Sequence, residues 1–259
     1  MSTLALRVSS SLGDLGRFFL FVRDVVAGFG RRPVQWAEAV EQAWRLARVV
    51  IVPTALVSIP LGAVVALQVG SLTAQLGAQS FSGAASVVAI LREGAPMATA
   101  LLLAGAGGSA ICADFGSRRI REEIDALEVL GIEVVPRLVV PRVVAAMAVA
   151  VLTTAVVMGV GIGGGYFFNV VLQGGTAGVY VESFRVLAST PDVWTSLFKG
   201  LVFGAIAAVV GSYKGLHVKG GPKGVGQAVN ESVVFSFLLL FAANYLISVA
   251  YFQLFPQGA

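Results

Sequence analysis

The chain has 259 residues, of which 57% are hydrophobic and only 12% are charged. A soluble domain carries about 25% charged residues, so this composition excludes an ordinary soluble protein and predicts a protein of the lipid bilayer. One membrane span needs about 20 apolar residues, so the length allows roughly five to seven spans and no separate soluble catalytic domain. With one histidine and one cysteine, an intramolecular disulfide is impossible and a zinc site is not expected.

The N-terminal region, residues 1–48, combines apolar positions at helical spacing with many basic residues. Residues 14–32 are too charged to cross a membrane and too apolar to be free in water, which is typical of an amphipathic helix lying in the membrane interface. Residues 35–48 extend this pattern, since Trp36 and Trp44 favour the interface. The region has no apolar core long enough for a signal peptide.

The rest of the chain, residues 49–259, alternates long apolar stretches with short polar ones. The pattern predicts an all-α membrane protein with five transmembrane helices. The expected spans are about 49–70, 83–113, 138–172, 193–213 and 229–255. Pro53 and Pro60 lie inside the first span, where neighbouring helices can accommodate a kink.

Basic residues concentrate in the N-terminal region and in the segments that follow the second and fourth spans. The positive-inside rule then places the N-terminus and residues 114–137 and 214–226 in the cytoplasm, and the C-terminus outside. These basic segments explain the net charge of +4 better than binding to nucleic acid does. The predicted location is therefore the plasma (inner) membrane, with several passes.

Residues 111–131, ICADFGSRRIREEIDALEVLG, hold one compact group of charges between two apolar regions. Six charges inside the bilayer would cost roughly 15–20 kcal/mol, so the group must lie outside the hydrocarbon. If the stretch is one helix, its i,i+4 spacing predicts the ion pairs Arg118–Glu122, Arg119–Glu123 and Arg121–Asp125. The apolar stripe of this helix must pack against another surface. In one alternative the helix is a solvated connector that packs on the protein's own membrane domain. In the other, which we favour, it docks on a cytoplasmic partner.

A family resemblance rests mainly on residues 105–145, GAGGSAICADFGSRRIREEIDALEVLGIEVVPRLVVPRVVA. This stretch resembles the signature of the MlaE/YrbE permeases, which are membrane subunits of ABC-type lipid transporters. Two further stretches match in order and spacing, LREGAP at 91–96 and GLHVKGGPKGVGQAVNESVV at 215–234. One departure is REGAP, where the family more often has Leu-Gly-Pro after Arg-Glu. The resemblance extends from about residue 12 onward and is closest to the actinobacterial YrbE branch that works with Mce proteins.

The resemblance implies that residues 114–130 form a coupling helix that fits a groove of a cytoplasmic ATPase. The residues expected at that contact are Asp114, Arg118, Arg119, Glu122, Glu123 and Asp125. The implied partners are a second permease, homologous or identical, an ABC ATPase dimer below, and Mce-type lipid-binding proteins on the outer side. The sequence has no Walker motif and no catalytic constellation, so we expect a transport subunit that is not an enzyme and binds no cofactor, with ATP and Mg held by the partner ATPase.

The resemblance also implies a lipid cavity between two permease copies, lined by the first, second and fifth spans. The candidates for this lining are Leu61, Val64, Val65, Gln68, Ile90, Met97, Phe241 and Tyr245.

Three charged residues, Arg92, Glu93 and Lys199, fall inside expected spans, where charge usually faces a cavity or a partner. They either form a polar patch for an acidic headgroup, or an internal ion pair of Glu93 with Lys199 or Arg92. In a third alternative the second span begins near residue 94, so that Arg92 and Glu93 lie at the outer surface of the membrane.

Several glycine-rich stretches mimic nucleotide-binding motifs without following a strand. Gly159, Gly161 and Gly164 form one, and Gly105, Gly107 and Ala110 form another; close helix packing explains both. Residues 220–226 are expected to form a cytoplasmic turn.

Two other functions stay open, an ion-coupled secondary transporter and a membrane scaffold that recruits a cytoplasmic partner. The residues do not distinguish which lipid is carried, in which direction, or whether the permease pair is a homodimer or a heterodimer.

Overall fold

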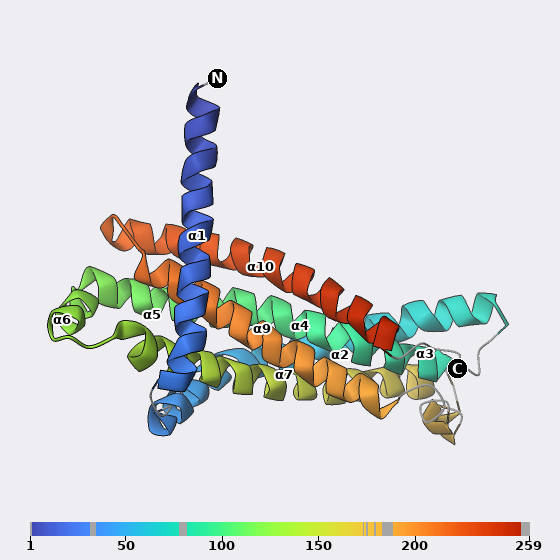
Figure 1. Cartoon of the computed structure of the whole chain (residues 1–259). Coiled ribbons are helices and arrows are strands. Elements are labelled where there is room, and N and C mark those ends of the chain that lie inside the picture. The colour runs from blue at the N-terminus through green and yellow to red at the C-terminus, as the bar shows by residue number, and fades with distance from the viewer. Residues whose placement is uncertain are drawn as a thin grey trace.

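The computed structural model describes residues 2–31, 35–77, 82–172, 174, 176–178, 180–182 and 189–254. Every regular element in these residues is helical, as the composition predicts (Figure 1). The α-helices are α1 (Ser2–Arg31), α2 (Trp36–Gln75), α3 (Ser82–Ala89), α4 (Ala95–Leu102), α5 (Ser109–Ile120), α6 (Glu123–Val129), α7 (Val140–Tyr166), α9 (Thr190–Leu216) and α10 (Gly221–Leu254). Four π-helical turns join them, η2 (Ile90–Gly94), η3 (Leu103–Gly108), η4 (Val135–Val139) and η5 (Phe167–Leu172).

Five helical segments of the described residues are long and apolar enough to cross a membrane, in the predicted number and order. They are Trp36–Gln75, Ser82–Ile120, Val135–Leu172, Thr190–Leu216 and Gly221–Leu254. The first segment differs most from its prediction, because α2 runs unbroken through the boundary expected at residue 48. The turn expected at 220–226 is wrong, since α10 begins at Gly221. Residue 255, the expected end of the fifth span, lies outside the described residues.

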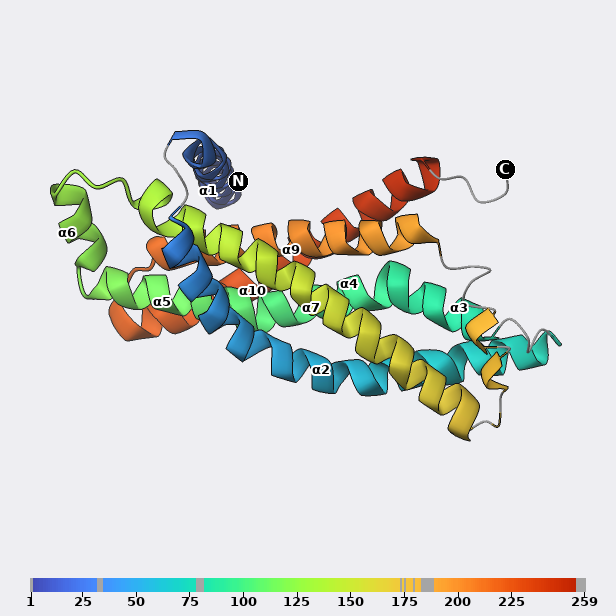
Figure 2. The same cartoon turned by 90° about the horizontal axis from the view of Figure 1, so that it is seen from below.

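The long helices run lengthwise beside one another, and α1 lies crosswise over one end of the bundle (Figure 1, Figure 2). That same end carries α6 and the start of α10, while the C-terminus lies at the opposite end. Helix α1 is anchored there by aromatic contacts, with the Phe18 ring centroid 5.2 Å from that of Tyr213 on α9 and 5.9 Å from that of Phe235 on α10. Helix α1 thus crosses the long helices, and its position in the membrane interface stays a prediction from the sequence.

The prolines shape two of the spans. In α2, which contains Pro53 and Pro60, nearby hydroxyls bond back to the helix: Thr54 donates to the Val50 carbonyl at 2.6 Å and Ser58 to the Thr54 carbonyl at 2.6 Å. In the second span, one residue, Ala95, separates the π turn η2 from Pro96. Proline removes a backbone donor, and a π turn is a usual way for a helix to absorb such a change.

Glycines let α9 approach its neighbours backbone to backbone. A Cβ added at Gly204 would lie 2.5 Å from the Ala146 carbonyl oxygen of α7, and one added at Gly211 would lie 2.7 Å from the Gly108 oxygen of η3. The motif glycine Gly161 likewise meets Gly62 of α2, whereas Gly159 and Gly105 have no neighbour within 4 Å. Close helix packing therefore accounts for only part of the glycine-rich motifs.

Candidate functional site

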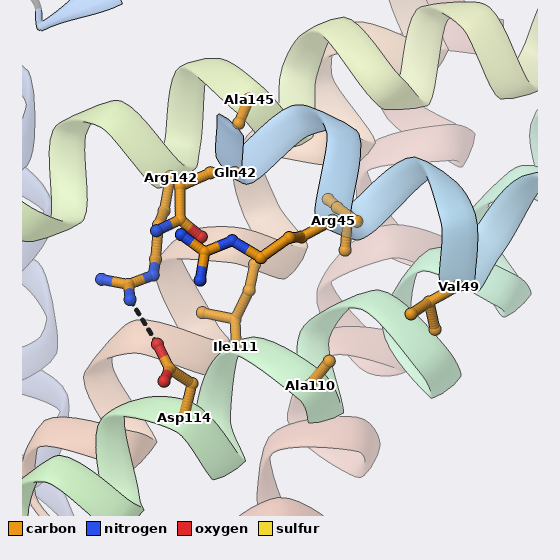
Figure 3. A pocket seen from close by; sticks show the side chains of 9 residues that line it. Gln42, Arg45, Val49, Ala110, Ile111, Asp114, Arg142 and Ala145 are labelled. Atoms are coloured by element: carbon orange, nitrogen blue, oxygen red, sulfur yellow. Dashed lines mark hydrogen bonds and ion pairs between the residues drawn. The ribbon is translucent and has the colours of Figure 1, made fainter. Parts of the chain in front are cut away.

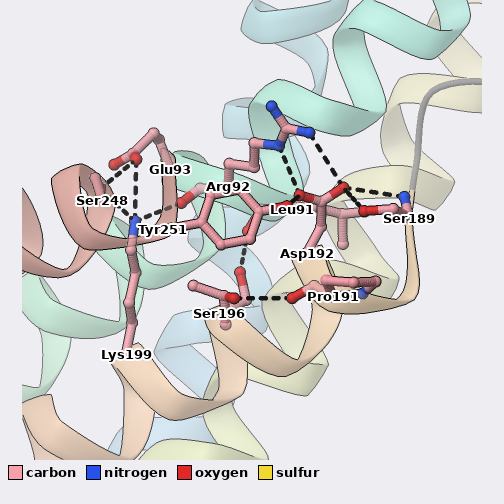
Figure 4. A network of polar contacts seen from close by, with 11 residues as sticks. Leu91, Arg92, Glu93, Ser189, Pro191, Asp192, Ser196, Lys199, Ser248 and Tyr251 are labelled. Carbon is pink, nitrogen blue, oxygen red and sulfur yellow. Dashed lines mark hydrogen bonds and ion pairs between the residues drawn. The ribbon is translucent and has the colours of Figure 1, made fainter. Parts of the chain in front are cut away.

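A network of charged and hydroxyl side chains joins η2, α9 and α10 inside the spans, toward the C-terminal end of the bundle (Figure 4). Its origin is the π turn before Pro96. The Ala95 N–H bonds to the Ile90 carbonyl, which leaves the Leu91 carbonyl without its usual helical donor. The Arg92 carbonyl has none either, because its i+4 residue is a proline. Buried carbonyls need donors, and α9 supplies both of them.

The two donors from α9 are Ser196 and Lys199, which lie almost one turn apart. The Ser196 hydroxyl donates to the Leu91 carbonyl, and the Lys199 ammonium donates to the Arg92 carbonyl at 2.8 Å. Both side chains are almost completely buried, Lys199 with 2% of its surface exposed. The π turn therefore fixes which residues of α9 stand opposite Arg92 and Glu93.

One half of the network is centred on Asp192, which is 1% exposed. Arg92 donates to it through Nε at 2.7 Å and Nη2 at 3.4 Å, a two-point ion pair. Asp192 also accepts from the backbone N–H of Ser189 at 3.0 Å and from its hydroxyl at 2.8 Å, which forms a capping box at the start of α9. The Tyr251 hydroxyl of α10 completes the set of donors to this carboxylate.

The other half is centred on Glu93. Its carboxylate accepts from Lys199 at 3.0 Å, from the Ser248 hydroxyl at 2.8 Å and from the Asn244 amide at 2.8 Å. Its side chain is 48% exposed although its partner Lys199 is buried. Glu93 lies eleven residues after Ser82, or about 16 Å along the second span at 1.5 Å per residue.

Two cations face two carboxylates in this network, so its formal charge is zero. The empty space among these side chains is about 10 Å³, which is room for at most one water molecule. Within this single chain the network therefore joins three spans and leaves no hollow large enough for a headgroup. No group of three metal-ligating side chains occurs among the described residues.

The uncharged cavity candidates fall into two classes. Ile90 is fully buried and packs on α7, while Leu61, Val65 and Met97 are partly buried. The other four lie exposed on α2 and α10: Val64, Gln68, Phe241 and Tyr245. Half of these candidates therefore lie on the outer surface of the single chain.

The charged stretch at the other end is two helices and not one, which corrects the prediction of a continuous coupling helix over 114–130. Helix α5 ends at Ile120 and α6 begins at Glu123, with Glu122 between them at φ +60°. A left-handed residue turns the chain sharply, so residues 118–121 and 122–125 no longer share a helical face. The predicted pairs Arg118–Glu122, Arg119–Glu123 and Arg121–Asp125 are therefore wrong.

Different ion pairs form instead. Arg118 bonds to Asp114 at 3.3 Å, Arg121 to Glu123 at 2.7 Å, and Arg119 to Asp125. Asp114 also binds Arg142 of α7, whose side chain is 4% exposed and whose guanidinium carbon lies 4.1 Å from the centroid of the Phe115 ring. Figure 3 shows this pair beside a hollow of about 230 Å³ between α2, α5 and α7. Asp114 thus ties the charged stretch to the bundle.

Apart from the Asp114–Arg142 ion pair, the charged stretch also exposes apolar side chains at its tip. Ile124 is 2% exposed and packs inward, whereas Val129 and Leu130 are 86% and 73% exposed at the tip. Glu122 and Glu123 are also exposed. The tip therefore combines carboxylates with an uncovered apolar pair.

Sequence reasoning did not find several residues of the polar network. Asp192 lies one residue before the expected start of the fourth span, and its signal was the capping-box pattern Ser-x-x-Asp at 189–192. Tyr251, Asn244 and Ser248 carried no comparable signal, because a hydroxyl or an amide in an apolar helix is often satisfied locally. Arg142 falls near the start of the expected third span, 138–172, and was not identified as the buried partner of Asp114.

Five long apolar helices, a neutral network of buried ion pairs among them and a charged tip at one end define a multi-pass helical membrane protein. The family model described as Permease MlaE matches residues 39–250. A probable ABC transporter permease protein of Synechocystis is 36% identical over 193 residues, which is 74% of this chain and 73% of that relative. The chain belongs to the MlaE permease family, and so is a permease subunit of an ABC-type transporter.

Further relatives extend the match over more of the chain. A probable ABC transporter permease protein of Rickettsia bellii is 28% identical over 258 residues, which is 96% of this chain and 100% of that relative. The chloroplastic protein TRIGALACTOSYLDIACYLGLYCEROL 1 of Arabidopsis thaliana is 28% identical over 230 residues, or 89% of this chain and 66% of that relative. The residues matched by the family model, 39–250, include the charged tip and all of the polar network except Tyr251.

Proposed function

We propose that this permease is the membrane subunit of an ATP-driven lipid transporter. Two permease copies, identical or homologous, would enclose the lipid, an ABC ATPase dimer would dock on the charged tip, and Mce-type lipid-binding proteins would receive or deliver lipid outside. The relatives named as ABC transporter permeases support the ATPase partner. In this arrangement the charged tip and α1 are cytoplasmic and the C-terminus is outside, in agreement with the distribution of basic residues.

One observation carries the proposal furthest: Glu93 is an ionisable residue within a span, yet its side chain is 48% exposed. Carboxylates in a membrane face a protein partner or a water-filled cavity and avoid lipid chains. Its partner Asn244 on α10 is followed directly by Tyr245 and lies one turn after Phe241, and both of these side chains are exposed. We therefore place a second permease copy opposite this face, so that the polar network and these apolar side chains together form the wall of the lipid cavity.

The same span offers a route by which ATP binding would reach that cavity. Residues Ser82–Ile120 form one continuous helical segment that carries Arg92 and Glu93 near one end and leads into the charged tip at the other. Two π turns, η2 and η3, interrupt its regular bonding, and such turns are where a helix bends most readily. A force applied at the tip would shift this span and alter the wall of the cavity.

Copurification and ATP hydrolysis separate this function from its rivals. We expect the permease to copurify with an ATPase whose hydrolysis rises when lipid is added to the assembly. An ion-coupled secondary transporter predicts no associated ATPase, and a scaffold predicts an ATPase whose rate ignores lipid. Either of those results would refute the proposal.

A further inference from the structure

Two hollows lie at the end of the bundle where α1 crosses α9 and α10, outside the site described above. The first, the α1 groove, has a volume of about 400 Å³, and all its lining side chains are apolar; those of α1 include Phe18, Phe19, Val22, Val26 and Phe29. The second, the basic pocket, has a volume of about 340 Å³ and contains Arg17, Lys214, Lys219 and Glu231.

The two hollows are adjacent along the chain on α1 and on α9. On α1, Arg17 of the basic pocket is followed directly by Phe18 and Phe19 of the α1 groove. On α9, Lys214 lies one turn after Val210, which lines the groove. The Phe18 ring contacts Tyr213 of the basic pocket, so aromatic side chains form the boundary between them.

The order of the two hollows along the span matches the order of the acyl chain and the headgroup of a lipid in one leaflet. The groove residues of α9 precede the basic ones, so the groove lies nearer the middle of the span and the basic pocket nearer its end. The basic pocket has three cations against one carboxylate, Glu231, which bonds to Lys214 at 2.8 Å. Basic pockets between membrane helices on the cytoplasmic side attract anionic headgroups.

We propose that an anionic phospholipid of the cytoplasmic leaflet binds here, with its phosphate in the basic pocket and an acyl chain in the α1 groove. The cytoplasmic assignment rests on the proposed orientation of the transporter. The bound lipid would hold α1 against α9 and α10, because it contacts all three. This site is separate from the polar network, which lies toward the opposite end of the same helices, so it would hold a structural lipid and not the transported one.

Photo-crosslinking tests the site on the whole assembly as purified. The assembly is placed in phosphatidylcholine vesicles that contain a trace of phosphatidylglycerol with a diazirine on its acyl chain, or of the matched phosphatidylcholine probe. We expect the anionic probe to label α1 and the second half of α9 about tenfold more than the zwitterionic one. The double variant R17Q/K219Q removes two exposed cations and should abolish this excess. K223Q, which removes a cation of α10 outside the pocket, should leave it unchanged.

Three outcomes would overturn the proposal: equal labelling by the two probes, full labelling of R17Q/K219Q, or displacement of the probe by inorganic phosphate, which would indicate an anion site without an acyl chain. Labelling requires no ATP. Lost labelling with intact lipid-stimulated hydrolysis would therefore refute the lipid site alone, while labelling without such hydrolysis would refute the transporter function alone.

Discussion

Lys199 shows how one residue links the fold to the proposed site. Its ammonium donates to a carbonyl that Pro96 leaves without a helical donor, and it also pairs with Glu93 on the face assigned to the lipid cavity. A buried lysine is tolerated only when such partners satisfy it. The residue is therefore both a structural tie between two spans and a neighbour of the transport pathway.

The variant K199M should destabilise the permease by about 1–3 kcal/mol, because the Arg92 carbonyl and Glu93 lose a donor in a poorly hydrated place. In the double variant K199M/E93Q the carboxylate charge is also gone, so part of the loss should be recovered, with a coupling of about 0.5–3 kcal/mol. Thermal unfolding of the four purified forms measures this cycle. Strictly additive losses would show that the two side chains do not interact.

The sequence predicted that Arg92, Glu93 and Lys199 lie within spans, but not which of them pair. Pairing depends on the rotation of α9 relative to the second span, and that rotation follows from the π turn at Ile90–Gly94. A π turn has no reliable sequence pattern. Asp192 was missed for a related reason, since the predicted boundary of the fourth span fell one residue after it.

At the scale of elements, α9 is positioned by its glycines. Gly204→Ala would bring a methyl group to 2.5 Å from a backbone oxygen of α7, which cannot move away without shifting the helix. Such overpacking costs about 1–3 kcal/mol. We therefore expect a lower unfolding temperature for G204A. Gly159→Ala on α7 is the matched control, because the added methyl group would meet no atom of a neighbouring helix within 4 Å. An equal loss in this control would contradict the packing argument.

The charged stretch gives the second prediction at this scale. Helix α6 projects from the end of the bundle, and Glu122 and Glu123 are exposed, so E122K/E123K should fold normally. Reversing two charges at a docking surface should release the ATPase, which copurification measures. Glu182→Lys, an exposed residue between η5 and α9, is the control and should retain the ATPase. A fully assembled and active E122K/E123K complex would refute docking at this tip.

Composition and hydropathy predicted the five spans because apolar length is a strong signal. The break at Glu122 could not be predicted in this way. Residues 114–130 have helical spacing throughout, and a left-handed glutamate is uncommon enough that propensity argues against it. Tertiary contacts override the local preference here: Asp114 binds Arg142, and Ile124 packs into the core, so the chain must turn between them.

The whole molecule has two unlike ends. One carries the charged tip, the crosswise helix α1 and the basic pocket, and the other lies nearer the polar network (Figure 1). Among the five candidate spans, α10 is the one least covered by the rest of the chain. Helix α10 also carries the hydrogen-bond partners of Glu93, a carboxylate inside the membrane. Both features are expected of a chain that pairs with a second permease in a larger assembly.

The central claim is that the charged tip contacts a cytoplasmic ATPase. The most direct test is to measure on which side of the membrane each end of the bundle lies. The native cysteine, Cys112, is fully buried, so an introduced cysteine can be labelled selectively. We predict that Leu130→Cys at the tip reacts with a membrane-impermeant maleimide only after the membrane is opened, while Ala74→Cys at the opposite end of α2 reacts in intact cells. Labelling of Leu130→Cys in intact cells, with Ala74→Cys protected, would contradict the claim.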